Sequence, residues 1–376
     1  MFEQMSYSTL QHYWWLIIAI LGGLLAFLFF VQGGQTLFSN LAKTNKERTL
    51  LVNALGRKWE FTFTTLVVFG GAIFASFPLF YSVSFGGAYW MWMIILFVFV
   101  LQAVSYQFRS KPGNWLGQSV YDRMLYLNGC IGTIFIGTMI ATFFTGAHFS
   151  TDLLNHVSWD TPYHGLEALL VFHNLSLGLA VFFLSRILAL HYFTNSIQHE
   201  EMLARTPRLV RINAALFLIF FLFFIGKLFL MEGYAIDSNQ QIGLEAHKYL
   251  YNFIEMPIVG GLFLIGVLLV LYSIFRSSLQ VWTKSIWYSA IGTILTVSTL
   301  IVSVGYNQTA FYPSLSTMQS SLTISNACSS KFTLLVMGYV SLLIPFIFLY
   351  IFYTWRMINK KKITTQEMDD ANNHAY

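Results

Sequence analysis

Residues 61–108 read FTFTTLVVFGGAIFASFPLFYSVSFGGAYWMWMIILFVFVLQAVSYQF, a stretch of 48 residues that contains no Asp, Glu, Lys or Arg. A helix needs about 20 apolar residues to cross the hydrocarbon core of a membrane. The stretch is therefore long enough for two antiparallel transmembrane helices, and Phe85-Gly86-Gly87 is the predicted turn between them. This segment alone predicts an all-α polytopic membrane protein.

The composition of the whole chain agrees with this prediction. Of its 376 residues, 56% are hydrophobic and only 10% are charged, whereas a soluble domain carries about 25% charged residues. Seven prolines and two cysteines exclude a collagen-like repeat and a disulfide framework. The formal net charge of +5 comes almost entirely from residues between the hydrophobic segments, so we expect no nucleic-acid partner.

Nine hydrophobic segments are long enough to span a membrane. We expect residues 1–362 to form one membrane domain of nine transmembrane helices, and residues 363–376 to form a polar, disordered cytoplasmic tail. A polar loop is expected at about 307–330, between the last two helices. The nine segments lie within 13–41, 61–108 (two), 124–149, 168–185 with its flanks, 212–231, 256–275, 285–306 and 332–355.

The positions of the basic residues predict the orientation of the chain. Of the 21 Lys and Arg residues, 18 lie in the loops after segments one, three, five and seven or after segment nine. Cytoplasmic loops carry the excess of Lys and Arg in membrane proteins. The N-terminus is therefore predicted outside, in the periplasm, and the C-terminus in the cytoplasm.

One acidic residue near a predicted membrane span is a candidate for proton chemistry. Glu60 follows Trp59 at the cytoplasmic start of the second span, directly after Arg57 and Lys58. A carboxyl group there could take up protons from the cytoplasm, and the neighbouring cations favour its ionised form. Position alone favours a simpler interpretation, in which Glu60 only interacts favourably with the positive end of the helix dipole.

Small and amide residues at the inner end of the first span predict close helix packing. Gln32-Gly33-Gly34-Gln35 combines glycines, which allow two helices to approach closely, with side chains that hydrogen-bond within lipid. We expect the same packing role for Gly70-Gly71 in the second span.

Histidine placement argues against a haem in this chain. His173 is the only histidine well inside a span, and bis-histidine ligation needs a second imidazole at a similar depth. We expect His173 to be a buried, hydrogen-bonded side chain, helped by Asn174. Cysteine and histidine spacing predicts no metal site.

Several short strings, taken in order, resemble subunit II of the cytochrome bd quinol oxidases. Each string is weak alone, but their order and spacing over about residues 14–357 make chance similarity improbable. They are Glu47-Arg48, Asn53, Trp59-Glu60, Gly70-Gly71-Ala72-Ile73-Phe74-Ala75, Pro78-Leu79-Phe80-Tyr81, Phe108-Arg109-Ser110-Lys111, Glu232-Gly233-Tyr234, Asn252-Phe253 with Pro257, Ser321-Leu322-Thr323, Ser329-Ser330, Thr333-Leu334 and Val336-Met337.

The chain departs from that family's pattern at three places. The family's first helix ends in Gly-Phe-Asp-x-Gly, whereas this chain has Phe30-Val31-Gln32-Gly33-Gly34 and lacks the acid. The family often continues Gly-Asn-Gln-x-Trp after the acid that follows Trp, but Phe61-Thr62-Phe63-Thr64-Thr65 stands here. Asn326 replaces an expected Asp. These differences indicate a divergent branch in which polar pathways are rerouted.

The resemblance implies a function and a set of partners. In that family the complex oxidises membrane quinol and reduces dioxygen to water, and subunit I holds haem b and haem d. It implies that this chain ligates no haem and no metal, contains no catalytic residue, and forms a heterodimer with subunit I in the bacterial cytoplasmic (inner) membrane. A small single-helix subunit, membrane lipid and quinone are further partners that it allows.

The resemblance also assigns residues to roles. Glu60 occupies the position of the family's acid after Trp, where a cytoplasmic proton-uptake path is proposed to start. Trp59, Gln32, Gln35 and Arg109 are expected to give polar or packing support to that path. Two alternatives remain: a secondary transporter, although the chain lacks the internal repeats typical of that class, and a purely structural scaffold for a haem-bearing subunit.

Overall fold

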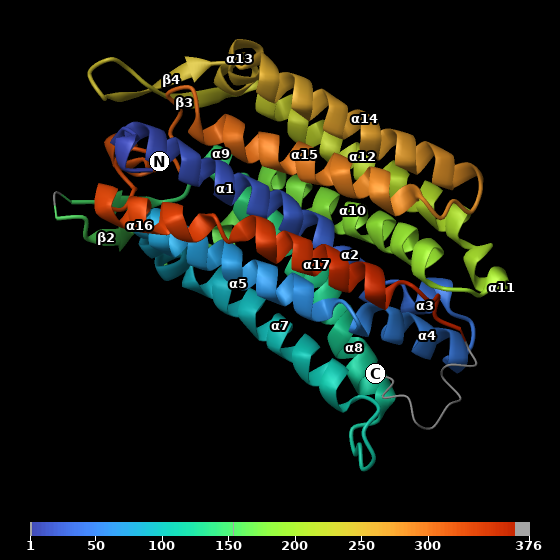
Figure 1. Ribbon diagram of the computed structural model, residues 1–376. Helices are drawn as coiled ribbons and strands as arrows, with labels where there is room; N and C mark the ends of the chain where they lie inside the picture. The colour runs from blue at the N-terminus through green and yellow to red at the C-terminus, as the bar shows by residue number, and fades with distance from the viewer. Residues whose placement is uncertain (1, 153, 365–376) are drawn as a thin grey trace.

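The computed structural model describes residues 2–152 and 154–364, and nine helical segments in that part of the chain are long and apolar enough to cross a membrane. This confirms the predicted all-helical architecture. Figure 1 shows these segments side by side in one bundle. The helices are α1 (Tyr7–Leu28), α2 (Phe30–Gln35), α3 (Phe38–Leu41), α4 (Asn45–Gly56), α5 (Trp59–Ser76), α6 (Pro78–Phe80), α7 (Tyr89–Phe108), α8 (Gln118–Leu127), α9 (Thr133–Thr145), α10 (Phe172–Ser196), α11 (Glu200–Leu203), α12 (Thr206–Leu230), α13 (Lys248–Glu255), α14 (Pro257–Leu279), α15 (Ser285–Gly305), α16 (Lys331–Ser341) and α17 (Ile344–Ile358).

The two ends of the bundle differ in structure (Figure 1). One end, here called the hairpin end, carries two antiparallel hairpins, β1 (Phe149–Thr151) with β2 (Val157–Trp159) and β3 (Glu232–Ile236) with β4 (Ile242–Ala246). The other, here called the basic end, carries α3, α4 and α11 and most of the Lys and Arg residues. This grouping agrees with the predicted alternation of loops. The orientation stays a prediction, in which the basic end faces the cytoplasm.

The predicted turn between the second and third spans is present. A π-helical turn over Tyr81–Gly87 leads into α7 at Tyr89. A Cβ atom on Gly87 would lie 1.6 Å from the indole Nε1 of Trp159, so only glycine fits at this close approach. The turn therefore packs tightly against hairpin β1–β2. The sequence did not predict this contact.

The last span differs from the single helix that we expected over 332–355. It is interrupted at Leu342 and Leu343, between α16 and α17, because Pro345 lacks the backbone N–H that a continuous helix needs. Beyond α17, the backbone N–H of Ile363 donates to the carbonyl of Ser196 at 2.9 Å. The rest of the predicted polar tail, from residue 365 on, lies outside the described residues.

The two glycine pairs behave differently. A Cβ atom on Gly33 would lie 2.1 Å from the backbone carbonyl carbon of Ser185 in α10, which confirms the predicted close packing of α2. Gly70 and Gly71 make no such close approach within the described chain. A Cβ on Gly71 would meet nothing within 4 Å, and one on Gly70 only a Phe85 ring carbon at 3.8 Å, because aromatic side chains, and not a second backbone, face this part of α5.

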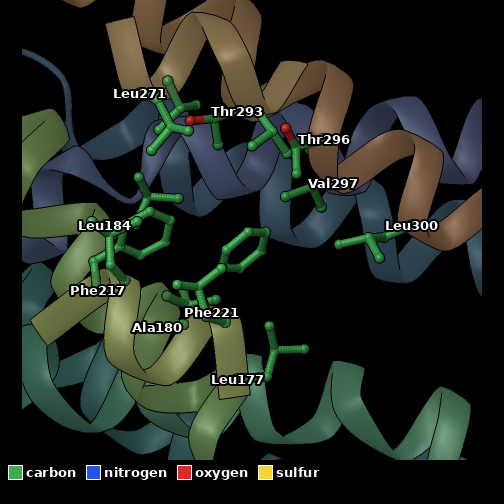
Figure 2. A pocket seen from close by; sticks show the side chains of 15 residues that line it. Leu177, Ala180, Leu184, Phe217, Phe221, Leu271, Thr293, Thr296, Val297 and Leu300 are labelled. Atoms are coloured by element: carbon green, nitrogen blue, oxygen red, sulfur yellow. The ribbon is translucent and has the colours of Figure 1, made fainter. Parts of the chain in front are cut away.

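A small apolar cavity of about 80 Å³ lies between α10, α12, α14 and α15 (Figure 2). Phe217 and Phe221 project into it from α12, and the hydroxyls of Thr293 and Thr296 lie on its α15 side. The hydroxyl of Thr296 donates to the carbonyl of Gly292 at 2.8 Å. Apolar cavities of this kind generally stay dry, so the site for polar chemistry must lie elsewhere.

Candidate functional site

Four segments meet near the basic end and form a largely buried polar cluster, defined here as Gln32, Gln35, Trp59, Gln102, Tyr106 and Asn128. They are α2, the start of α5, α7 and a π-helical turn over Asn128–Gly132. A Cβ atom on Gly129 would lie 2.4 Å from the carbonyl oxygen of Gln32, so glycine permits this approach of the turn to α2. The close contact brings polar side chains from distant parts of the sequence together.

Direct hydrogen bonds join two pairs in the polar cluster. Gln32 donates through Nε2 to Oε1 of Gln102 at 3.0 Å, and Gln35 donates through Nε2 to the hydroxyl of Tyr106 at 3.2 Å. The ring of Trp59, from α5, stacks on the Tyr106 ring with a centroid distance of 5.8 Å and an interplanar angle of 14°. The structure therefore brings together Gln32, Gln35 and Trp59, as the expected support role requires.

Several amide atoms in the polar cluster lack partners within residues 2–152 and 154–364. They are Oε1 of Gln32 and of Gln35, Nε2 of Gln102, and both side-chain polar atoms of Asn128. All four side chains are 0% exposed. Buried polar groups in proteins are nearly always hydrogen-bonded to protein or to ordered water. The polar cluster thus offers both donors and acceptors to small polar molecules.

A buried ion pair lies toward the basic end from the polar cluster. Arg109 is only 2% exposed, and its Nε lies 2.7 Å from Oδ1 of Asp122. The other carboxylate oxygen of Asp122, Oδ2, lies 3.6 Å from Nη1 of Arg48. Arg109 is the C-cap residue of α7 and follows Gln102 by seven residues, so it lies about 10 Å further along the helix axis. The Arg109–Asp122 pair therefore marks the border of the site toward the basic end.

The acid that we singled out from the sequence lies beside the polar cluster, not in it. Glu60 is exposed in the first turn of α5, while the neighbouring Trp59 ring reaches Tyr106. Successive residues on a helix point about 100° apart, which explains the difference. Lys58, the residue before Trp59, is fully buried, with Nζ 4.0 Å from the centroid of the Trp355 ring.

Sequence reasoning missed four residues of the site and its border: Gln102, Tyr106, Asn128 and Asp122. One signal was available. Gln102 and Tyr106 are four residues apart within the charge-free stretch 61–108, so they lie on the same face of one helix. No comparable sequence signal pairs them with α2, because that contact depends on the fold.

His173 is buried as predicted, but it is the second residue of α10 and not well inside the span, and His191 is also buried in this helix. The expected hydrogen bonding of His173 is wrong. Neither ring nitrogen has a hydrogen-bond partner in the described part of the chain. Its ring instead stacks on Phe224, with centroids 4.7 Å apart. Asn174 accepts a hydrogen bond from Thr145 at 2.8 Å and does not reach His173.

The Gln32–Gln102 contact can be tested by substitution. Gln102→Leu leaves the Gln32 amide without its acceptor, and we expect the free energy of unfolding to fall by about 1 kcal/mol. Interhelical hydrogen bonds in membrane proteins contribute about 0.6 kcal/mol on average and at most about 1.7 kcal/mol. The double variant Gln32→Leu/Gln102→Leu should recover part of this loss, since both partners are removed. Thermal unfolding of the two single variants and the double variant measures the coupling energy between Gln32 and Gln102. Strictly additive losses of stability would contradict a hydrogen bond between these two side chains.

Comparisons with known proteins agree with one another. A sequence model of the family "Cytochrome bd terminal oxidase subunit II" matches residues 10–358. Cytochrome bd-I ubiquinol oxidase subunit 2 of Escherichia coli K12 is 25% identical, over 98% of this chain and 99% of the relative. A probable cytochrome oxidase subunit 2 of Haemophilus influenzae is 26% identical, over 88% of this chain and 89% of the relative.

A solved structure shows the same fold. A chain of the bd oxidase from Geobacillus thermodenitrificans matches with a TM-score of 0.62 and 16% identity, covering 94% of this chain and 100% of that chain. The likeness supports the helix arrangement, and the family match replaces the secondary-transporter alternative. Because the matched residues 10–358 include nearly all of the 376 residues, this chain belongs to the family of cytochrome bd terminal oxidase subunit II.

Proposed function

We propose that this chain is the haem-free half of a bacterial inner-membrane quinol oxidase that supports cytoplasmic proton uptake. Its partner would be a subunit I that holds haem b and haem d, where electrons from quinol reduce dioxygen to water. The names of the relatives support this proposal, since the protein of Escherichia coli is subunit 2 of a ubiquinol oxidase. The family's haem groups supply the redox chemistry, and this chain supplies helices and polar side chains.

The histidines inside the bundle fit no haem, which supports placing the haems in the partner. His173 is packed against Phe224. His191 is fully engaged, with Nδ1 3.0 Å from the hydroxyl of Ser289 and Nε2 2.7 Å from that of Ser277. Axial haem ligation needs a free imidazole nitrogen that faces an open site. Neither side chain offers both features.

Glu60 is the proposed start of proton uptake. Its exposed carboxyl at the basic end can exchange protons with solvent, and its neighbour Trp59 reaches the buried polar cluster; this adjacency is the observation that carries the proposal. The unpaired amide atoms there suit ordered water, which conducts protons between side chains. If the basic end faces the cytoplasm while quinol releases its protons outside, the reaction separates charge without a pump.

The proposal predicts a specific loss in Glu60→Gln. This change removes the titratable group but keeps the size of the side chain. We expect quinol-driven oxygen consumption to fall about tenfold, below the range of about 10²- to 10⁴-fold for a group that transfers protons directly, because water still reaches the surface. Oxygen-electrode rates are measured per haem, with haem content and subunit ratio determined on the same purified complex.

Glu201→Gln is the matched control. Glu201 is also exposed at the basic end, in α11, and we expect full activity from this variant. Unchanged turnover of a fully assembled Glu60→Gln complex would remove the proton-uptake role. In that case the chain would act as a structural scaffold for subunit I.

A further inference from the structure

A second cavity lies at the basic end, beside the polar cluster, with which it shares only Gln35. Its volume is about 330 Å³, and its lining includes Gln35, Ser39, Arg48, Ser119, Asp122 and Arg123. We propose that this cavity binds the phosphate headgroup of an anionic phospholipid. The inference rests on the cavity and its charges, and is independent of a role for Glu60.

The charge around the cavity favours an anion. Arg48 and Arg123 line it, and Arg109 pairs with Asp122, so the cavity and its border hold three guanidinium groups and one carboxylate. Asp122 is already held by Arg109 at 2.7 Å. Nε of Arg48 is buried with no hydrogen-bond partner in the described chain. Positive charge and free donors therefore remain for a phosphate group.

Helix α8 adds to this positive potential. It spans ten residues, Gln118–Leu127, and its N-cap Gly117 makes no side-chain cap hydrogen bond. The first N–H groups of a helix and its dipole attract anions. Ser119, in the first turn, lines the cavity. A phosphate held beside Ser119 would thus lie near the first turn of α8 as well as near the arginines.

Gln35 is an independent sign that a ligand with hydroxyl groups fits here. It lines the cavity while being 0% exposed, and its Oε1 has no hydrogen-bond partner among the residues that the structure describes. A carbonyl oxygen accepts a hydrogen bond from a hydroxyl but repels a bare anion. Headgroup glycerol, as in phosphatidylglycerol, supplies a phosphate diester for the arginines and hydroxyls for Gln35.

The surroundings favour a lipid over a soluble phosphate. The cavity is lined by α3, α4 and the start of the membrane span Gln118–Thr145. Tyr126, which lines the cavity, and Leu127 are large exposed apolar side chains at the end of α8. Both lie further along this span than Arg123, so acyl chains can lie along them. Basic pockets between membrane helices are known to bind anionic headgroups.

The test compares lipid binding by two double variants of the purified complex. Arg48→Gln/Arg123→Gln removes the two arginines that line the cavity. Arg208→Gln/Arg211→Gln removes two exposed arginines from α12 at the same end and is the matched control. After delipidation, phosphatidylglycerol, phosphatidylcholine and inorganic phosphate are each titrated, and binding is followed by native mass spectrometry and by the thermal unfolding midpoint.

We expect the wild type and the control to retain one phosphatidylglycerol at this site in preference to phosphatidylcholine. Each arginine removed should weaken that binding about fivefold. The single variant Arg123→Gln, an exposed side chain, keeps the test valid if the double variant does not assemble. Three results would each overturn a lipid site. The wild type and the Arg48 and Arg123 variants could bind phosphatidylglycerol with equal affinity, or phosphatidylcholine could bind as well as phosphatidylglycerol. Inorganic phosphate alone could also raise the thermal unfolding midpoint as much as the lipid does.

Discussion

Gly33→Ala is expected to abolish or strongly reduce assembly of this subunit. The added Cβ would lie 2.1 Å from the carbonyl carbon and 2.2 Å from the carbonyl oxygen of Ser185, and 2.5 Å from the backbone nitrogen of Arg186. All three atoms belong to the backbone of α10, so no side chain can rotate away. Helices α2 and α10 must separate, which costs about 3 kcal/mol or more, the upper end of the range for overpacking.

The displacement should also impair function. Gly33 lies between Gln32 and Gln35, so a shift of α2 moves both amides away from Gln102 and Tyr106. Any complex that assembles with Gly33→Ala is therefore expected to show a lower thermal unfolding midpoint and slower oxygen consumption. The thermal unfolding midpoint and the rate of oxygen consumption are measured on the purified complex. The amount of the subunit in the membranes is determined by immunoblot.

Gly71→Ala is the control for the chemical change itself. A Cβ there meets nothing within 4 Å, and alanine favours a helix over glycine by about 1 kcal/mol. We expect a neutral or slightly stabilised protein. If Gly33→Ala were as stable as Gly71→Ala, the close approach of α2 to α10 would be refuted.

The contrast between these glycines shows what sequence can predict for this protein. The nine spans follow from residue counts, because bilayer thickness and helix rise fix the length of each apolar stretch. The role of a glycine pair does not follow, since it depends on which element lies opposite. Gly33 faces the backbone of α10, whereas Gly71 faces open space.

The candidate site could be predicted only in part, because its residues come from elements that are far apart in the sequence. Gln32, Gln35 and Trp59 stand out as polar or aromatic residues near span ends, and they do meet in the polar cluster. Asn128 and Gln102 complete it only because the π-helical turn packs on α2, a contact between elements far apart in the chain. The side-chain direction of Glu60 also required the structure, because a residue number gives depth along the helix but not the face.

Glu47→Gln is expected to have the second large effect, on stability. Glu47 is 4% exposed and holds Arg205 through two bonds, Nη1 to Oε2 at 3.0 Å and Nη2 to Oε1 at 3.1 Å. It also closes the capping box of α4, in which its backbone N–H donates to the hydroxyl of Thr44 at 3.1 Å. The Glu47 carboxylate therefore connects the start of α4 to Arg205, which lies between α11 and α12.

Removing the charge leaves the guanidinium of Arg205 in a low-dielectric site without its counter-ion. Breaking a buried ion pair costs about 3 to 5 kcal/mol, and because the Arg205 side chain is 22% exposed, we expect a value near the low end, about 3 kcal/mol. The thermal unfolding midpoint of the purified complex should fall by several degrees, while Glu200→Gln, an exposed neighbour in α11, should leave it unchanged.

A double variant separates the ion pair from the cap. In Glu47→Gln/Arg205→Met no unpaired cation remains, so most of the lost stability should return, since replacing both members of a buried pair with uncharged side chains is often nearly neutral. A smaller loss, about 0.3 to 1 kcal/mol, should persist in the double variant, because Gln can keep the capping-box hydrogen bonds but not the negative charge at the start of α4. A double variant no more stable than Glu47→Gln would show that Arg205 is not the group that Glu47 stabilises, and that the carboxylate acts on α4 alone.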